Sequence, residues 1–459
     1  METTNLQGSI VSSSEQEEKK VSAEPQKILA GFRVNRPNRE QIDTRPQSLD
    51  ALLPEGHRAR LVWDFVERQD LSGFYAGIKV REGGPGRTAI APEILFALWL
   101  YGTVEGVGSA RELARLTEEH DAYRWICGGV QVNYHTLADF RVDHEKLLDD
   151  LLTSNLASLL AVGAVKLNRV AQDGMRVRAS AGAASFRRGK TLEDHLRVAN
   201  EQVTRLKTVL HRDLPSPSKR SQAARERAAR ERKQRGERAL ERLPEIEEAK
   251  RRQGKPAEKA RVSTTDPEAT VMKMADGGFR PAYNTQFATD TESQIIVGVA
   301  VITSGSDQGQ LTPMVKQVNE RCGITPGSWL VDGGYPSHDQ IDAVSEQTVI
   351  YAPVPASKKA DIDPHVPKKG DSESVAKWRE RMGTEEAKVI YKERAATAEC
   401  VNAQTRQRGL TCLRVRGRCK ARSIALWYTL AHNLMRMVSL VPEWFGEGVV
   451  ASRVPVIAI

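Results

Sequence analysis

The sequence predicts a mixed α/β fold, with a sheet domain, an all-helical region before it and a helical hairpin inserted into it. The sheet is predicted by two strand-like runs, 167–172 and 329–331, each of which ends on an aspartate followed at once by glycine, at Asp173 and Asp332. The hairpin is predicted by apolar residues that recur four and three positions apart between 192 and 210, a heptad pattern.

The composition narrows the classes of function. The 459 residues suffice for two or three domains with a sizeable core. The formal net charge of +9 favours a polyanionic partner, since a basic surface attracts phosphate backbones. The five cysteines form no Cys-x-x-Cys pair, so we expect reduced thiols and neither a zinc site nor a disulfide framework. Without a signal peptide or an apolar run of membrane-spanning length, we expect a soluble, cytoplasmic protein.

The N-terminal third divides into a tail and a helical region. Residues 1–31 are rich in Ser, Glu, Gln and Lys, and we expect them to be disordered. Residues 32–163 are expected to form an all-helical domain, whose later part holds three or four helices opening at Pro92, at a capping box on Ser109 and at Thr136. Such helices suit a helix-turn-helix-like DNA-binding module, and equally a packing domain with solvated arginines. The candidate DNA contacts are Arg111, Arg115, Arg124 and Arg141.

Residues 164–186 and 262–437 are expected to form the sheet domain, and residues 187–261 the inserted hairpin. Its first helix ends before Pro215, and a second, crowded with Arg, Lys and Glu, covers about 219–252. A charge run of this kind is usually a solvated face with paired signs, and contact with DNA phosphates is the alternative. The arginines that would make this contact are Arg225, Arg227, Arg230, Arg232 and Arg235.

The second part of the sheet domain alternates strands and helices. The expected elements are strands over 279–290 and 294–302, a helix over 311–322, and strands over 328–331 and 348–353. Asp290 is expected to hold the turn of the strand hairpin and Asp307 to cap the helix, so neither is favoured as a site residue. Residues 438–459 are expected to form a C-terminal tail.

A third acid, Glu399, lies in a helical stretch that also holds Tyr391, Arg394 and Arg406. Arg394 lies five residues before the glutamate and Arg406 seven after it, and we expect both to lie near its side of a helix with about 3.6 residues per turn. Arginine suits a phosphate because its guanidinium donates two parallel hydrogen bonds. Asn402 is polar where the helix face beside Glu399 is expected to be apolar. Taken alone, each acidic segment also fits a tight turn or a solvated helix face.

Taken together, the three segments resemble the catalytic core of DDE transposases of bacterial insertion sequences, in the group with a Tyr-x-x-Arg signature before the last acid. The matching pieces are Asp173-Gly174-Met175-Arg176-Val177, Val331-Asp332-Gly333-Gly334-Tyr335, and Tyr391-Lys392-Glu393-Arg394 leading to Glu399 and Arg406. Further agreement comes from Tyr283-Asn284-Thr285-Gln286, from Asp307-Gln308-Gly309-Gln310-Leu311, and from His135-Thr136-Leu137-Ala138-Asp139-Phe140-Arg141. The resemblance covers about 32–437. In the usual signature the glutamate lies one residue nearer the arginine.

The resemblance implies a ribonuclease H-like catalytic core, whose order of strand, strand, strand, helix, strand, strand, helix the expected elements follow. It implies that Asp173, Asp332 and Glu399 are catalytic and ligate two Mg²⁺ ions, for which Mn²⁺ can substitute. Such ions lie about 3.5–4 Å apart in two-metal sites and stabilise the attacking and leaving oxygens of an in-line displacement. It also implies that Tyr391, Arg394 and Arg406 contact DNA.

The implied function is that of a transposase that binds terminal inverted repeats, cleaves DNA and joins the freed 3′ end to target DNA. The alternatives are a catalytically silent DNA-binding derivative and a ribonuclease H-like nuclease. The presence of all three acids favours an enzyme over the first alternative, and Tyr391 with Arg394 argues against the second. The expected partners are double-stranded DNA, at the element ends and the target, and a second copy in a homodimer, with no membrane. The expected location is the cytoplasm, at the nucleoid.

Overall fold

The computed structural model describes residues 48–80, 88–210, 216–356 and 363–445. The tail expected over 1–31 lies outside these ranges. Within them, no helix has the length and apolar character needed to cross a membrane.

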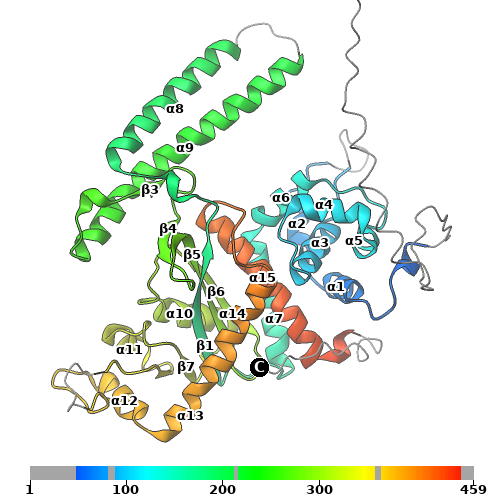
Figure 1. The fold of residues 1–459 in the computed structure, drawn as a ribbon. Helices are drawn as coiled ribbons and strands as arrows, with labels where there is room; N and C mark the ends of the chain where they lie inside the picture. The colour runs from blue at the N-terminus through cyan, green and yellow to red at the C-terminus, as the bar shows by residue number, and fades with distance from the viewer. Residues whose placement is uncertain (1–47, 81–87, 211–215, 357–362, 446–459) are drawn as a thin grey trace, which may run out of the picture. The chain divides into compact units, whose positions relative to one another are not determined.

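The described chain is organised around a mixed sheet with β1 (Arg169–Arg178) inside it (Figure 1). β1 pairs antiparallel with β5 (Phe279–Asp290) on one side and parallel with β7 (Ser328–Leu330) on the other. β8 (Val349–Tyr351) lies parallel to β7 at the edge. The four strands expected at these places are confirmed, with ends shifted by a few residues.

On the edge away from β1, the long strand β5 has a different antiparallel partner along each half of its length. Its first residues pair with β4 (Thr270–Lys273), an edge strand that the sequence pattern did not predict, and its second half pairs with β6 (Ile296–Ile302). Asp290 holds the β5–β6 turn as expected, because its Oδ2 accepts hydrogen bonds from the backbone N–H of Ser293 at 2.9 Å and from its hydroxyl at 2.6 Å. The antiparallel half of the sheet therefore consists of β1, β4 and β6 paired with the central strand β5.

One helix leads from β6 to β7, and a second connects β7 to β8. α10 (Leu311–Cys322) has the expected bounds. α11 (His338–Val344), between β7 and β8, was not expected. It buries only Ile341 and Val344, and so short a segment is too small to show a helical period.

The helices that follow β8 are α12 (Glu373–Met382), α13 (Glu385–Arg394), the π-helical turn η4 (Ala395–Glu399), α14 (Cys400–Gln407) and α15 (Arg418–Leu440). α13, η4 and α14 follow one another without a break, so the stretch from Tyr391 to Arg406 is one continuous helix, as expected. α15 continues to Leu440, beyond the expected start of the C-terminal tail.

The N-terminal region is all-helical, as expected. Its helices are α1 (Arg58–Glu67), α2 (Ser72–Tyr75), α3 (Pro92–Val104), α4 (Ala110–Glu119), α5 (Asp121–Cys127), α6 (Tyr134–Asp143) and α7 (Glu145–Ala161). Ser109 caps α4 by accepting the N–H of Glu112. From α3 onward there are five helices rather than three or four, because His120 caps a separate α5 and the non-helical His144 divides α6 from α7.

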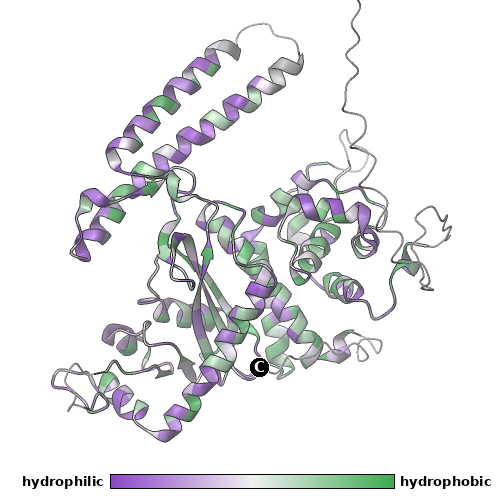
Figure 2. Cartoon of the chain, viewed as in Figure 1, coloured by the Kyte–Doolittle hydropathy of each residue, from purple (hydrophilic) through white to green (hydrophobic). Residues whose placement is uncertain are grey.

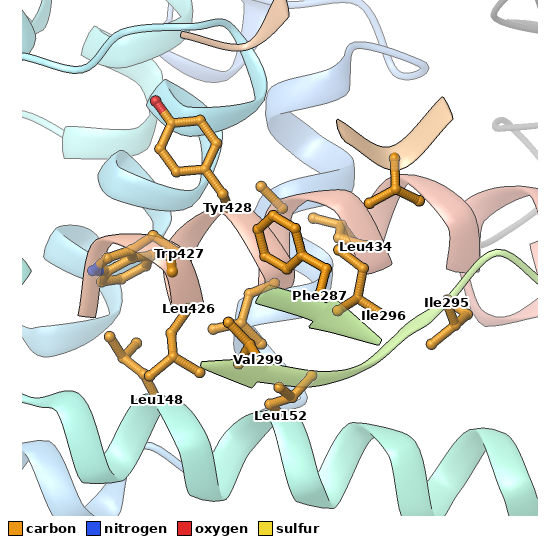
Figure 3. Packing of buried hydrophobic residues seen from close by; sticks show 14 of the residues in the cluster. Leu148, Leu152, Phe287, Ile295, Ile296, Val299, Leu426, Trp427, Tyr428 and Leu434 are labelled. Atoms are coloured by element: carbon orange, nitrogen blue, oxygen red, sulfur yellow. The ribbon is translucent and has the colours of Figure 1, made fainter. Parts of the chain in front are cut away.

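One hydrophobic core joins the helical region to the sheet through α15. Figure 3 shows side chains of α7, α15 and the β5–β6 hairpin pointing toward one another, among them Leu148, Leu426 and Val299. The indole of Trp427 in α15 lies 4.9 Å, between ring centroids, from Phe96 in α3 and donates a 3.0 Å hydrogen bond to the carbonyl of Arg141 in α6. The last long helix thus packs on both the helical region and the sheet.

The inserted hairpin consists of α8 (Gly189–Leu210) and α9 (Ser216–Arg252), which run side by side (Figure 1). Of the heptad positions, Leu192, Ala199 and Val203 are buried. In Figure 2 the ribbon of α9 is coloured hydrophilic along most of its described length. At the base of the hairpin the short strands β2 (Phe186–Arg187) and β3 (Val262–Ser263) pair antiparallel. This pairing brings the two ends of the insertion together. The remaining short helices are η1 (Asp50–Leu52), η2 (Ala183–Ser185), η3 (Ala257–Lys259) and η5 (Pro442–Phe445).

Candidate active site

The pairing of β1 with β7 brings Asp173 and Asp332 to the same end of the sheet. In this parallel pair Ala171 lies opposite Leu330, and each aspartate follows its strand partner by two residues. Because parallel strands run in the same direction, the two carboxylates leave the sheet beside each other. The Asp332 carboxylate is also held locally, since its Oδ1 accepts the N–H of Gly334 at 2.6 Å.

Glu399 approaches the two aspartates from the helix above the sheet. Ala398 in η4 is buried in a small apolar cluster with Ala171 of β1 and Leu330 of β7. This contact seats the π turn on the two strands that carry the aspartates, so the next residue, Glu399, lies at their ends. Its side chain is 67% exposed, whereas that of Asp173 is 19% exposed.

The guanidinium of Arg394 lies among the three acids. Its Nη2 is 3.2 Å from Oδ1 of Asp173 and 4.0 Å from Oδ2 of Asp332. Its Nη1 is 3.9 Å from Oε1 of Glu399. The arginine side chain is only 12% exposed, and its buried Nε has no hydrogen-bond partner among the described residues. A single cationic group therefore brings together three carboxylates that come from three different elements.

The π turn, and not the regular helical spacing that we expected for Arg394, accounts for its contact with Glu399. Five residues along a regular α-helix correspond to about 1.4 turns, which would separate the two side chains around the helix. In a π turn the hydrogen bonds run from i to i+5, so residues five apart lie above one another. The extra residue between the arginine and the glutamate is thus accommodated without moving the glutamate off the site.

Asn402 is a site residue that the sequence pattern did not identify. It lies in α14 one turn after Glu399, is buried, and donates from Nδ2 to Oδ2 of Asp173 at 2.9 Å. The signal in the sequence was its polarity on an otherwise apolar helix face, since residues three apart on a helix are neighbours. Its buried Oδ1 has no partner among the described residues.

The groups around Asp173 have opposing effects on the pKa of its carboxyl. Burial raises the pKa of the Asp173 carboxyl above its ordinary value, and the Arg394 guanidinium and the Gly174 N–H act against this increase. The negative charges of Asp332 and Asp307 raise it further. Burial also raises the pKa of the Tyr391 hydroxyl, the charge of Arg394 acts against this increase, and the carboxylates of Asp332, Asp173 and Glu399 add to it.

The donor set of the site fits a hard divalent cation. Three carboxylates and an unpartnered amide oxygen, on Asn402, supply the oxygen ligands that Mg²⁺ prefers. As the side chains stand, with the guanidinium between the acids, no group of three or more His, Cys, Asp or Glu in the described ranges is close enough to hold a metal ion. In this arrangement the Arg394 guanidinium is the cationic group that the three acids share.

Asp307 has a different place from the one expected. Its side chain does not cap α10, whose N-cap residue is Gln310. Instead it accepts hydrogen bonds from Asn284 at 2.6 Å and from Gln286 at 2.7 Å, and it forms an ion pair with Arg176 at 3.2 Å. The expectation was wrong because these partners come from β1 and β5, far away in the sequence.

Among the expected DNA contacts, Arg406 is exposed and none of the described residues forms an ion pair with it. Arg111 is exposed with its guanidinium over the ring of Tyr134, and the exposed Arg115 pairs with Glu119 one turn away. Arg124 pairs with Asp121 at 3.0 Å. All of these side chains remain at the surface.

Arg141 has a structural role instead of a surface one. It is 6% exposed, donates from Nη1 to the carbonyl of Gly108 at 2.8 Å, and lies 4.3 Å above the ring of Trp99. The expectation that it contacts DNA is corrected by this burial. The sequence alone does not separate Arg141 from the exposed arginines, because the packing of α3, α4 and α15 on α6 decides which face of α6 is covered.

The hairpin arginines are largely paired. Arg230 and Arg235 form ion pairs with glutamates one turn earlier, and Arg232 donates to Gln202 of α8 at 2.7 Å. Arg225 and Arg227 are exposed. This pattern is that of a solvated helix face with paired charges.

Two family models match the chain. Residues 47–143 match the model described as a transposase domain (DUF772), and residues 251–436 match the model described as a transposase DDE domain. The second match contains Asp332 and Glu399, whereas Asp173 lies before its start. No curated protein and no solved structure gives a significant match.

Proposed function

The chain belongs to the DDE transposases of insertion sequences, and on that premise we propose that it binds the terminal inverted repeats of its element, cleaves them and joins the freed ends to target DNA. The observation that carries the proposal is the convergence of Asp173, Asp332 and Glu399 on one cationic group. A structural ion pair needs one acid, whereas phosphodiester cleavage with divalent metal ions uses several carboxylates at one point.

The catalytic core is proposed to be ribonuclease H-like. Support comes from the order β1, β5, β6, α10, β7 and β8, in which three antiparallel strands precede a parallel pair. We propose that residues 164–186 and 262–437 form this core, with 187–261 as an insertion and 32–163 as the DNA-binding region. The tail boundaries at 31 and 438 are part of the same proposal.

Asp173, Asp332 and Glu399 are proposed to hold two Mg²⁺ ions, or Mn²⁺ in their place. When bound there, such ions supply activation of the attacking oxygen and stabilisation of the leaving oxygen. Asn402 keeps the Asp173 carboxylate in one orientation through its 2.9 Å hydrogen bond. Arg394, released from the acids, is positioned to donate to a phosphate of the bound strand, for which its planar guanidinium is suited.

We propose that further DNA contacts lie both on the catalytic core and on the N-terminal helical region. Tyr391 and Arg406 on the active-site helix would contact the cleaved DNA, and Arg111 and Arg115 the duplex at the element end. Two copies are proposed to act as a homodimer on paired ends, at the nucleoid in the cytoplasm.

The experiment uses a labelled duplex that carries the ends flanking this gene, with Mg²⁺ or Mn²⁺. We expect the wild type to nick at the end junction and to join the end to target DNA. Asp332→Asn should bind the duplex and leave it intact. Asp339→Asn, which changes an exposed aspartate of α11, is the matched control and should cleave like the wild type.

Three results would contradict the proposal. If the wild type binds the duplex but does not cleave it with either Mg²⁺ or Mn²⁺, the protein is a catalytically silent DNA-binding derivative. Cleavage of RNA–DNA hybrids without joining would identify a nuclease. Unimpaired cleavage by Asp332→Asn would show that Asp332 is not a metal ligand.

A further inference from the structure

A network of buried polar side chains lies beside the candidate active site and has Gln286 of β5 at its centre. Gln286 lies directly opposite Gly174 in the β1–β5 pair, so the two residues face the same side of the sheet. Asp173 is the preceding residue, and its side chain points to the other side. Gln286, Gln172 and Tyr335 are completely buried.

The first connection of Gln286 leads to the loop that carries Asp332. The hydroxyl of Tyr335 donates to Oε1 of Gln286 at 2.6 Å, and the backbone N–H of Tyr335 donates to the carbonyl of Asp332 at 3.2 Å. The loop has no strand pairing of its own after Leu330 apart from Val331, whose N–H bonds to Tyr351. The Tyr335 side chain is therefore its anchor on the sheet.

The second connection leads to the strand that carries Asp173. Nε2 of Gln172, one residue before the aspartate, donates to the same Oε1 of Gln286 at 3.1 Å. Oε1 of Gln172 in turn accepts the indole N–H of Trp329 in β7 at 3.0 Å. One oxygen atom of Gln286 thus joins the strand of the first aspartate to the loop of the second.

The other end of Gln286 fixes which way its amide points. Nε2 donates to Oδ1 of Asp307 at 2.7 Å and to Oδ1 of Asn284 at 3.2 Å. A carboxylate accepts but does not donate, so the NH₂ group must face Asp307 and the oxygen must face Tyr335 and Gln172. Both amide hydrogens and both oxygen lone pairs are used, which holds the side chain in one orientation.

We propose that Gln286 is a positioning residue, which sets the spacing of the Asp173 and Asp332 carboxylates for metal binding through Tyr335 and Gln172. This inference rests on the proposed function, because it assigns the two aspartates as metal ligands. Gln286 touches neither aspartate side chain, and its effect is expected in the affinity for the ion rather than in binding of DNA. Residues that orient metal ligands typically change metal affinity by about 10–100-fold when replaced.

The test measures Mn²⁺ binding from the EPR signal of the free ion, in the full chain. Tyr335→Phe removes one hydroxyl, and Gln286→Met removes the amide at similar volume. We expect both variants to bind Mn²⁺ about tenfold more weakly than the wild type and to bind end DNA equally well. Cleavage by Tyr335→Phe should return to the wild-type rate when Mg²⁺ is raised about tenfold, and urea denaturation of this variant in EDTA should give the wild-type midpoint, which a variant that is only less well folded would not.

Thr289→Val is the matched control. Thr289 lies on the same strand, is buried, and its hydroxyl has no partner among the described residues. It should bind Mn²⁺ like the wild type. The proposal is overturned if Tyr335→Phe and Gln286→Met keep wild-type affinity, or if Thr289→Val loses as much. A wild type that binds no Mn²⁺, or an Asp332→Asn variant that binds it unchanged, would instead refute the assignment of the metal ligands.

Discussion

Asn402 and Asp173 lie 229 positions apart in the sequence and are joined by a 2.9 Å hydrogen bond from the amide Nδ2 to the carboxylate Oδ2. The bond spans the contact between α14 and β1, and it occupies one oxygen of an acid whose other oxygen faces Arg394. Asn402 therefore connects the helix of Glu399 to the strand of the first aspartate.

We expect Asn402→Asp to shift the acid limb of the pH–rate profile to higher pH. In the proposed mechanism Asp173 binds a cation only when it is ionised, so cleavage should fall as the pH drops through its pKa, which burial already raises. A second carboxylate in place of the amide donor raises that pKa further, because a like charge disfavours ionisation. The measurement is the cleavage rate as a function of pH. Asn319→Asp, on α10, is the control and should leave the acid limb of the profile at its wild-type pH. An unshifted acid limb in Asn402→Asp would contradict the hydrogen bond between Asn402 and Asp173.

We expect Arg394→Gln to destabilise the protein only while metal is absent. The variant leaves three carboxylates without their shared cation, which should lower the free energy of unfolding in EDTA by about 2 kcal/mol, less than for a fully buried pair because the acids are partly exposed. Mg²⁺ should recover most of the loss. Urea denaturation with and without Mg²⁺ measures both values.

The matched control for Arg394 is Arg169→Gln. Arg169 pairs with Glu393 at 2.5 Å between β1 and α13, and both side chains are more than a third exposed. Its loss should cost at most about 1 kcal/mol, with no dependence on Mg²⁺. An equal loss with and without Mg²⁺ in Arg394→Gln would show that the arginine does not share the place of a metal ion.

We expect Gly174→Ala to lower stability by about 1–3 kcal/mol, the usual cost of overpacking a core. A β-carbon there would lie 2.3 Å from Oδ1 of Asp307 and 2.3 Å from Nε2 of Gln286. These atoms are held by their own hydrogen bonds and cannot withdraw freely. Gly182→Ala is the control, because a β-carbon at Gly182 meets no atom within 4 Å. Equal denaturation midpoints for the two variants would contradict the close packing of the network on β1.

We expect substitution of Arg141 to lower stability and substitution of Arg115 to weaken DNA binding. Arg141→Met should cost about 2–3 kcal/mol, because it removes a buried charged hydrogen bond and a stacking contact with Trp99. Arg115→Ala should change stability by less than about 0.5 kcal/mol, and it should weaken binding of end DNA and reduce its salt dependence. Denaturation and DNA titrations at two salt concentrations test this. Weaker DNA binding by Arg141→Met at unchanged stability would contradict the buried role.

The sequence by itself determined the elements whose signal is local. Strand-like runs ending in Asp-Gly located Asp173 and Asp332, the helical stretch located Glu399, and the heptad pattern located the hairpin, because periods of two, of 3.6 residues and of heptads depend only on neighbours along the chain. The matched transposase domains agree with the family that these segments indicated.

The tertiary structure decided which side chains meet. The place of Arg394 between the acids requires the π turn to sit on the ends of β1 and β7. The burial of Arg141 requires α3, α4 and α15 to pack on α6. Asp307 bonds to Gln286 instead of capping a helix, and this contact requires β5 to lie beside β1. Each is a contact between residues far apart along the chain, and such contacts are set by how whole elements pack, which no local pattern encodes.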